Sequence, residues 1–166
     1  MTLDDRHGQV RDARRADCKA IAAIYNEGIV EGRSTFETDL RSTADIEEWL
    51  GSPAHPVLVA ETDGTVAGWA RISPYSPRSC YAGIAEASVY VREAARGHRL
   101  GSALAATLRD RAEQVGLHKV IGKLFAENEQ SRRLAARHGF REVGVHLRHG
   151  QVDGEWHDVI VAELLL

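Results

Sequence analysis

One stretch near the middle of the chain constrains the fold more than any other. Val89-Tyr90-Val91 alternates as a strand does, Arg96 to Ser102 is rich in arginine and glycine, and an amphipathic helix runs on to about Val115. A strand that turns through glycines into a helix leaves backbone N–H groups pointing outward. With the positive end of the helix dipole, these groups form an anion site suited to a pyrophosphate. From these residues alone, a plain tight turn before a helix is an equally good interpretation.

The glycine-bearing turn lacks the features of two common nucleotide sites. It has no lysine-serine pair of the kind that a Walker loop carries. Its glycine spacing also differs from that of a dinucleotide-binding fingerprint. Nucleotide hydrolysis and NAD binding are therefore poor interpretations of this motif.

Length and charge exclude further classes. The 166 residues suit one domain, 1–166, and the net charge of −3 argues against broad nucleic-acid binding. No apolar run approaches the ~20 residues of a membrane span. Residues 1–8 are polar and charged, which predicts a flexible N-terminus, no secretory signal and a cytoplasmic protein. Cys18 and Cys80 have no metal-binding spacing and no two histidines stand four apart, so we predict reduced thiols and no metal site.

Segments of strand and helix character alternate along the chain. Asp63-Gly64 lies between two apolar runs and predicts a β-hairpin, because Gly64 tolerates the positive φ that the turn needs. The predicted strands are 9–12, 57–61, 65–72, 85–91, 119–124, 141–147 and 157–166; the predicted helices are 17–29, 43–50, a long one ending near 115, and 130–138; 73–82 and 150–154 are loops. This mixture predicts an α+β fold around one sheet.

A second motif follows the long helix. It consists of Asn128, Ser131, Leu134 and Gly139-Phe140, at the junction of a predicted strand and a short helix. Asn128 is well placed to cap that helix. From the same place, its side-chain amide could instead bond an amide of a cofactor.

The two motifs, in this order and about thirty residues apart, resemble the cofactor-binding core of the Gcn5-related N-acetyltransferases (GNAT). The resemblance runs from Val10 to the C-terminus and implies the GNAT fold, a single mixed, largely antiparallel sheet flanked by helices. It implies that acetyl-CoA is the co-substrate, with its pyrophosphate at the glycine turn and its pantetheine arm along the preceding strand. The residues on which it places acetyl-CoA are Val89, Tyr90, Val91, Gly97, His98, Arg99, Leu100, Gly101, Ser102, Asn128 and Ser131.

Two positions depart from the family pattern. The family usually has glycine at the fourth position of Arg-x-x-Gly-x-Gly, where this chain has Arg99. A side chain there points away from the phosphates or adds a cation near them. Many members also carry a tyrosine after the leucine of the last helix, which protonates the leaving thiolate, and here that residue is Ala135. Either no side chain acts as general acid, or Tyr90 or a water serves.

A narrower resemblance points to the phosphinothricin acetyltransferase branch. It rests on Ile24-Tyr25-Asn26, on Glu86-x-Ser88-Val89-Tyr90-Val91 and above all on Trp156-His157-Asp158-Val159. That branch acetylates the α-amine of small amino acids and analogues such as phosphinothricin, methionine sulfoximine and methionine sulfone. Its members are commonly homodimers. The resemblance therefore implies a small-molecule amine acceptor and a homodimer.

The chemistry requires a base, because a protonated amine cannot attack a thioester. Glu86 is our candidate, since it lies just before the cofactor loop, faces away from Val89 and matches an acidic residue proposed as the base in the branch. A surface glutamate on an edge strand is the alternative. His157 is a second candidate, to relay the proton or bond the substrate. A histidine packed in the last hairpin is its alternative.

An acidic acceptor would need a cation. Arg71, Tyr75 and Arg78 lie between the third strand and the Glu86 strand, and arginine binds two oxygens of a carboxylate or phosphinate at once. We favour Arg78, because the branch tends to keep an arginine in this loop; solvated arginines are the alternative. Phe36 is placed near the acceptor site or in the core.

Three functions remain open at this stage. The first is acetylation of a small amino acid or analogue. The second is acetylation of a protein N-terminus or an aminoglycoside, which an acidic acceptor groove would favour. The third is a non-catalytic acyl-CoA-binding sensor, which Arg99 and Ala135 keep open.

Overall fold

The computed structural model describes residues 8–166 and contains one seven-stranded sheet in the order β1-β2-β3-β4-β5-β7-β6. Neighbouring strands are antiparallel except β4 and β5, which are parallel. The strands are β1 Gln9–Asp12, β2 Val57–Thr62, β3 Thr65–Pro74, β4 Ile84–Val91, β5 Lys119–Phe125, β6 Arg141–Val152 and β7 Glu155–Leu165. The helices are α1 Cys18–Glu31, α2 Thr43–Glu47, α3 Leu100–Gln114 and α4 Glu129–Arg137. The predicted α+β fold with a mixed, largely antiparallel sheet is confirmed.

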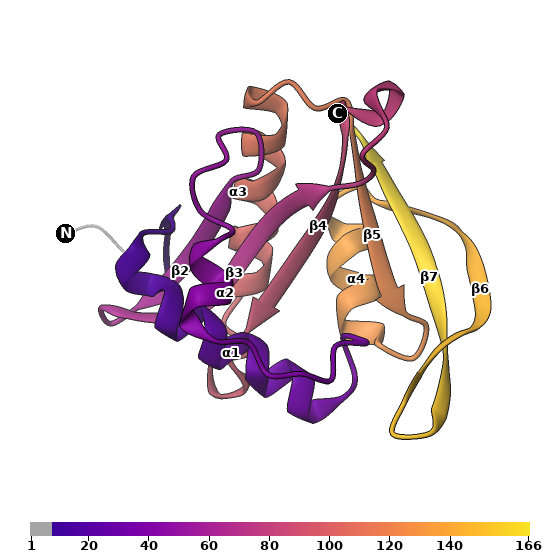
Figure 1. Cartoon of the computed structure of the whole chain (residues 1–166), viewed down its shortest axis with the longest axis horizontal. Helices are drawn as coiled ribbons and strands as arrows, with labels where there is room; N and C mark the ends of the chain where they lie inside the picture. The colour runs from indigo at the N-terminus through magenta and orange to yellow at the C-terminus, as the bar shows by residue number, and fades with distance from the viewer. Residues whose placement is uncertain (1–7) are drawn as a thin grey trace.

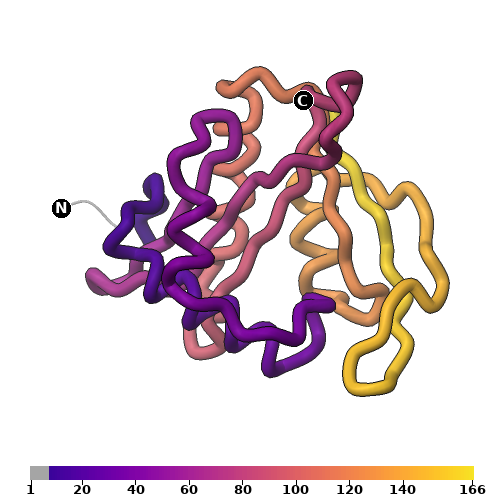
Figure 2. The backbone as a smooth tube through the Cα atoms, viewed as in Figure 1, coloured from indigo at the N-terminus to yellow at the C-terminus, as the bar shows by residue number. Residues whose placement is uncertain are grey.

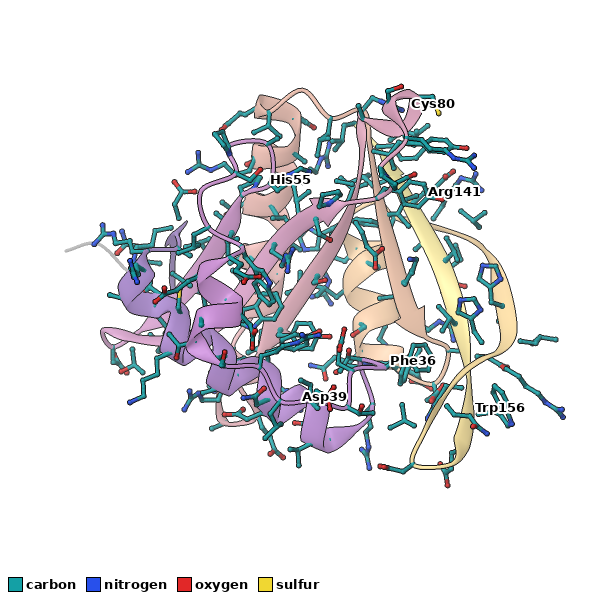
Figure 3. All side chains as sticks on the ribbon, in the orientation of Figure 1. Phe36, Asp39, His55, Cys80, Arg141 and Trp156 are labelled. Carbon is teal, nitrogen blue, oxygen red and sulfur yellow. The ribbon has the colours of Figure 1, made fainter. Side chains whose placement is uncertain are left out.

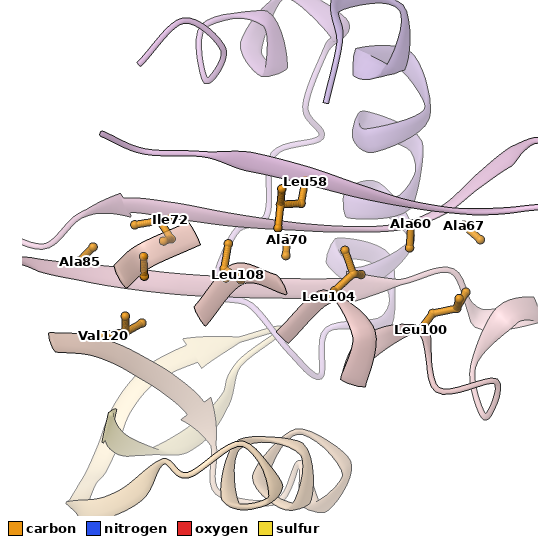
Figure 4. Close-up of a cluster of buried hydrophobic side chains, with 11 residues drawn as sticks. Leu58, Ala60, Ala67, Ala70, Ile72, Ala85, Leu100, Leu104, Leu108 and Val120 are labelled. Carbon is orange, nitrogen blue, oxygen red and sulfur yellow. The ribbon is translucent and has the colours of Figure 1, made fainter. Parts of the chain in front are cut away.

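The helices form a layer on each face of the sheet (Figure 1). Helix α1 packs with α2 on one face, and α3 packs on the other against β2, β3 and β4. The buried side chains under α3 include Leu104 and Leu108, which meet Ala70 and Ile72 of β3 (Figure 4). On the opposite face, Ile21 and Ile24 of α1 pack with Trp69. These two apolar layers hold the central strands in place from both sides.

The alternation predicted for β4 is confirmed. Ala87, Val89 and Val91 pack in the cluster under α3, whereas Tyr90 packs in the cluster under α1. The hairpin between β2 and β3 also forms as expected. Asp63 and Gly64 have φ values of 51° and 74°, the pair of positive angles that a two-residue turn between twisted strands requires.

The last hairpin is longer than predicted. We expected a loop over 150–154, but β6 continues to Val152 and the turn is Asp153-Gly154 alone. A β-bulge interrupts the pairing between His146 and Gly150. Gly150 lies within the strand and passes close to Phe36. An added Cβ would lie 2.8 Å from Phe36 Cδ1, so a side chain at this position would collide with the ring. The glycine that suggested a turn therefore marks a close approach.

Three further boundaries differ or fall outside the described residues. Helix α2 is capped by Ser42, whose hydroxyl accepts from the Asp45 N–H, and the predicted cap at Thr43 is wrong. Strand β3 runs on to Pro74, into the predicted loop. Of the N-terminal segment 1–8, residues 1–7 lie outside the described residues, and Gly8 lies against Leu100 and Glu61. No helix of the described part is long and apolar enough to cross a bilayer.

Candidate active site

The central parallel pair separates half-way along its length. Strands β4 and β5 pair from Ile84 with Lys119 to Glu86 with Ile121, and beyond these residues they have no register with each other. Figure 1 shows them close at one end and wide apart at the other, and Figure 2 shows the same divergence of the two backbones. The inner edge of each strand beyond that point therefore has backbone groups without a strand partner, which is suited to an extended ligand that carries amides.

An apolar pocket of about 90 Å³ lies between the two arms on the α3 and α4 face. Its walls include Ala87 and Val89 of β4, Gly122 and Leu124 of β5, and Leu134 and Ala135 of α4. Ser131, a predicted cofactor contact, also lines it. A narrow slot with apolar walls and unpartnered backbone at its edges fits a pantetheine arm.

The first turn of α3 stands at the end of the β4 arm. Its N-cap is Arg99, which has a φ of 62° and makes no capping hydrogen bond with its side chain. Within residues 8–166, no acceptor is found for the backbone N–H groups of Leu100, Gly101 and Ser102. Gly97 has a φ of 85°, and a Cβ added there would meet no atom within 4 Å. The turn is open and its donors are free, as an anion site at a helix N-terminus requires.

Arg99 and His98 are both exposed at this turn, and Arg99 occupies the left-handed conformation that usually selects glycine. Ser102 differs from them, because its hydroxyl lies 2.8 Å from His138 Nε2 on α4. Burial lowers the pKa of His138, with a smaller contribution from the charges of Arg137 and Arg109. The Ser102–His138 contact therefore joins the predicted phosphate loop to the end of α4.

Asn128 caps α4, as one interpretation predicted. Its Oδ1 accepts from the Ser131 N–H at 3.0 Å, and its Nδ2 donates to the Arg33 carbonyl at 3.4 Å. Asn128 is therefore the N-cap of α4. Through the long bond to the Arg33 carbonyl, its amide nitrogen lies against the loop between α1 and α2.

The Glu86 carboxylate lies on the α1 face, opposite the pocket wall formed by Ala87. Glu86 Oε2 accepts from Lys123 Nζ of β5 at 2.9 Å. Lys123 was not singled out in the sequence, because the register of β4 with β5 has no local signal. The structure places Glu86 on a central strand, so the edge-strand alternative is wrong.

Arg71 of β3 lies on the same face. It pairs with Ser88 in the β3–β4 register, while Ser73 pairs with Glu86. The guanidinium carbon lies 4.0 Å from the centre of the Trp49 ring. Burial lowers the pKa of Arg71, and its Nε has no partner within the described part of the chain. Arg71 therefore presents a cation on the face of Glu86 that has no carboxylate partner among residues 8–166.

The other predicted acceptor residues are dispersed. Tyr75 and Arg78 are exposed in the loop between β3 and β4, where Tyr75 meets Tyr81 edge to face at 5.7 Å. Phe36 lies at the far end of the strands and packs on Phe125 of β5, with ring centres 4.6 Å apart. Figure 3 shows Phe36 near the end of β5 and Cys80, which marks the loop, at the opposite end.

His157 lies beside Phe36 on β7. Its ring stacks on Phe125 at 4.7 Å, and its Nδ1 bonds the Glu127 carboxylate. The side chain is 13% exposed, so it is packed without being sealed. Glu127, which the sequence did not suggest, fixes the orientation of the imidazole.

Tyr90 is enclosed by aromatic rings. It stacks on Trp69 at 4.8 Å and meets Tyr25 at 5.0 Å, and its hydroxyl donates to the Ser34 carbonyl at 3.3 Å. Burial raises the pKa of Tyr90 well above its ordinary value. The hydroxyl is thus directed to the loop after α1, on the face opposite the pocket.

A model of the acetyltransferase (GNAT) family matches residues 19–140. The chain belongs to this family. The GNAT enzyme described here therefore depends on acetyl-CoA and transfers acetyl to an amine, as the sequence resemblance implied.

Two curated relatives agree with the narrower resemblance. The chain is 35% identical to the phosphinothricin N-acetyltransferase of Streptomyces coelicolor, over 91% of this chain and 92% of that protein. It is 34% identical to the L-methionine sulfoximine/L-methionine sulfone acetyltransferase of Pseudomonas aeruginosa, over 95% of this chain and 94% of that protein. The resemblance to the phosphinothricin acetyltransferase branch is confirmed.

Solved structures share the same architecture. A phosphinothricin acetyltransferase from Sinorhizobium meliloti, solved with acetyl-CoA, is 29% identical with a TM-score of 0.91 and covers 96% of this chain and 89% of that one. A ribosomal-protein-alanine N-acetyltransferase from Brucella melitensis is 33% identical, also with a TM-score of 0.91, over 95% and 99% of the two chains.

Proposed function

We propose that this GNAT enzyme acetylates the α-amine of a small amino acid or analogue, of the phosphinothricin or methionine sulfone type, by direct attack of the amine on the thioester. The observation that carries the acceptor class is Arg71. It is a partly buried cation with no carboxylate partner among the described residues, on the same face as the carboxylate of Glu86. A cation and an anion side by side fit the acid group and the ammonium of an amino acid.

Acetyl-CoA fits the other face of the divergent strands. The free N–H groups of Leu100, Gly101 and Ser102 would hold its pyrophosphate, and the pocket edged by Val89 and Ser131 would take the pantetheine arm. When bound, acetyl-CoA supplies an acetyl group activated as a thioester. Of the other predicted contacts, Val91, Gly97, His98, Arg99 and Asn128 belong to the same proposal, whereas Tyr90 packs on the opposite face.

Glu86 acts as the base in this proposal. Its carboxylate takes a proton from the acceptor's ammonium, directly or through one water. The free amine then forms the new C–N bond with the thioester carbon, the C–S bond breaks, and the sulfur leaves with the electron pair. The nitrogen gives up its second proton to water as the amide forms. Arg71 holds the acid group of the acceptor and thereby fixes where the nitrogen stands.

His157 and Tyr90 receive different roles. The His157 imidazole, oriented by Glu127, borders the acceptor side together with Phe36, so we propose that it bonds or shapes the acceptor. Tyr90 is buried with its hydroxyl on a backbone carbonyl, which favours a structural role over proton donation. Ala135 lines the pocket where relatives of other branches have a tyrosine, so the leaving thiolate would take its proton from water.

A second candidate acceptor is a protein N-terminus. It is favoured by the likeness to the solved enzyme named a ribosomal-protein-alanine N-acetyltransferase. The Arg71 cation favours the small amino-acid acceptor instead, because a peptide N-terminus carries no α-carboxylate for it to bind. A non-catalytic sensor is the third candidate, and it would bind acetyl-CoA without turnover.

We also propose a homodimer and a cytoplasmic location, where acetyl-CoA and free amino acids meet. Strand β6 is the outer strand of the sheet and exposes Leu147 (76%), Val145 and Val143. An edge strand with apolar side chains is suited to pair with a second copy. Sedimentation or light scattering would give a mass of twice 18.2 kDa for the dimer.

The acceptor is tested by following thiol release from acetyl-CoA with a panel of amines. The panel contains phosphinothricin, methionine sulfone, methionine sulfoximine, ordinary amino acids, an aminoglycoside and a short peptide. We expect turnover on the amino-acid analogues. Turnover on the peptide or the aminoglycoside alone would contradict the proposed acceptor class, and acetyl-CoA binding with no turnover on any amine would support the sensor.

A further inference from the structure

The ion pair between Glu86 and Lys123 spans the point where the sheet divides. Glu86 is the last residue of β4 that pairs with β5, opposite Ile121. Lys123 comes two residues later, so it stands on the β5 arm just past the division and faces the same side as Glu86. The Nζ–Oε2 distance of 2.9 Å makes this a direct ion pair between β4 and β5, at the point where the two strands begin to separate.

Lys123 is the cation that the Glu86 carboxylate contacts. Ser73, on the other neighbouring strand, donates to the backbone carbonyl of Glu86 and leaves the carboxylate free. Arg71 is the second nearby cation, but its guanidinium lies over Trp49 and forms no ion pair with Glu86 in the described residues. The position of the carboxylate therefore depends on Lys123.

Several other charged groups near this face are paired with one another in the described part of the chain. Glu163 of β7 is held by Lys119 and Arg141, His157 by Glu127, and Glu37 by Arg41 in the loop between α1 and α2. The cation bonded to the Glu86 carboxylate is Lys123.

We propose that Lys123 is a positioning residue for the base, an inference that rests on the proposed role of Glu86. Its ammonium holds the carboxylate in place on the acceptor side, where β4 and β5 part. The acceptor's ammonium then competes for the same oxygens, and Lys123 yields its place when the acceptor arrives.

The exposure of the pair fits this role. The Glu86 side chain is 29% exposed and that of Lys123 is 46% exposed, so water screens the bond and it contributes little to the stability of the fold. The neighbouring Lys119–Glu163 pair is more enclosed, with exposures of 26% and 12%. The Glu86–Lys123 pair contributes little to folding and includes the proposed base. Its role therefore belongs to the reaction.

The test compares Lys123→Met, Lys123→Arg and the matched control Lys119→Met, which removes a lysine of the same strand and face. The readouts are kcat and KM for phosphinothricin with saturating acetyl-CoA, together with the KM for acetyl-CoA. Because the Glu86 carboxylate loses the bond that fixes its position, we expect Lys123→Met to lower kcat by about 10- to 100-fold while the KM for acetyl-CoA stays within about twofold. Lys123→Arg should restore most of kcat, and Lys119→Met should leave it unchanged.

An unchanged kcat in Lys123→Met would overturn the inference. The Glu86→Gln variant separates this failure from that of the proposed function. If Glu86→Gln is inactive and Lys123→Met keeps full kcat, Glu86 is the base and only the role of Lys123 fails. If Glu86→Gln keeps full turnover, the proposed base itself is wrong and the inference falls with it.

Discussion

Arg71 lies over the Trp49 ring, with 4.0 Å between the guanidinium carbon and the ring centre. The contact holds a partly buried cation whose Nε has no partner in the described residues. A guanidinium over an aromatic face can still offer N–H groups to a carboxylate. This arrangement distinguishes Arg71 from the exposed Arg78, which the sequence favoured.

Replacing Arg71 should therefore weaken acceptor binding more than any change at Arg78. We expect Arg71→Met to raise the KM for phosphinothricin by about 10- to 100-fold, the value of a charge-assisted hydrogen bond to an acid group. Arg78→Met, the matched control, should change it by less than about fivefold, as for an exposed charge. Steady-state kinetics at saturating acetyl-CoA measures both. A larger effect at Arg78 would reverse the assignment.

The backbone of Arg99 offers a test of strain. A residue other than glycine in the left-handed region is disfavoured, so Arg99→Gly should raise the free energy of unfolding by about 0.5–1 kcal/mol. Arg99→Ala removes the same charge but keeps the strain, and it should leave stability unchanged. Because the backbone donors remain, both variants should change the KM for acetyl-CoA by less than about fivefold. A larger rise in both would show that the guanidinium binds the phosphates.

Tyr90 should prove structural. Tyr90→Phe keeps the ring between Trp69 and Tyr25 and removes only the bond to the Ser34 carbonyl. We expect a loss of about 0.5–1.5 kcal/mol in urea unfolding and a turnover number within about twofold of the wild type. A turnover number that collapses while the fold stays intact would instead make Tyr90 the general acid.

His138 should make stability depend on pH. Its folded-state pKa is lowered, so the unfolded chain binds the proton more tightly. The contribution is fully present above the unfolded pKa of about 6.5 and is lost as pH falls from there through the folded pKa. Urea unfolding at about pH 7.5 and about pH 5.5 should show a smaller decrease for His138→Gln than for the wild type. His98→Gln, a change at an exposed turn, should keep the full decrease; an equal decrease in all three proteins would contradict the prediction.

The local features of the fold could be read from the sequence. Asp63-Gly64 requires two positive φ angles wherever it stands between strands, and the two faces of β4 follow from alternation alone. Gly150 was misread because a turn and a close approach to Phe36 select the same residue. A glycine in the sequence indicates that a position needs a special backbone angle or has no room for a side chain. It does not indicate which neighbouring residue takes up that room.

The site could be predicted only in part, for a related reason. Glu86 follows from its position before the glycine turn, and Asn128 from its place before a helix. The sequence does not indicate Lys123 or Glu127, because the residue that each one bonds lies 30 residues or more away in the chain. Only the folded sheet brings these partners together. Arg71 was suggested only as one of two arginines, because its stacking on Trp49 depends on the packing of α2 against β3.

The central claim is that Glu86 takes the proton from the ammonium of a small amino-acid acceptor. The most direct test is thiol release from acetyl-CoA with phosphinothricin near neutral pH, by the wild type, by Glu86→Gln and by the exposed control Glu155→Gln. We expect Glu86→Gln to lose about 10²- to 10⁴-fold in kcat, the usual contribution of a general base, with acetyl-CoA binding intact. Glu155→Gln should match the wild type. Full turnover in Glu86→Gln would contradict the account.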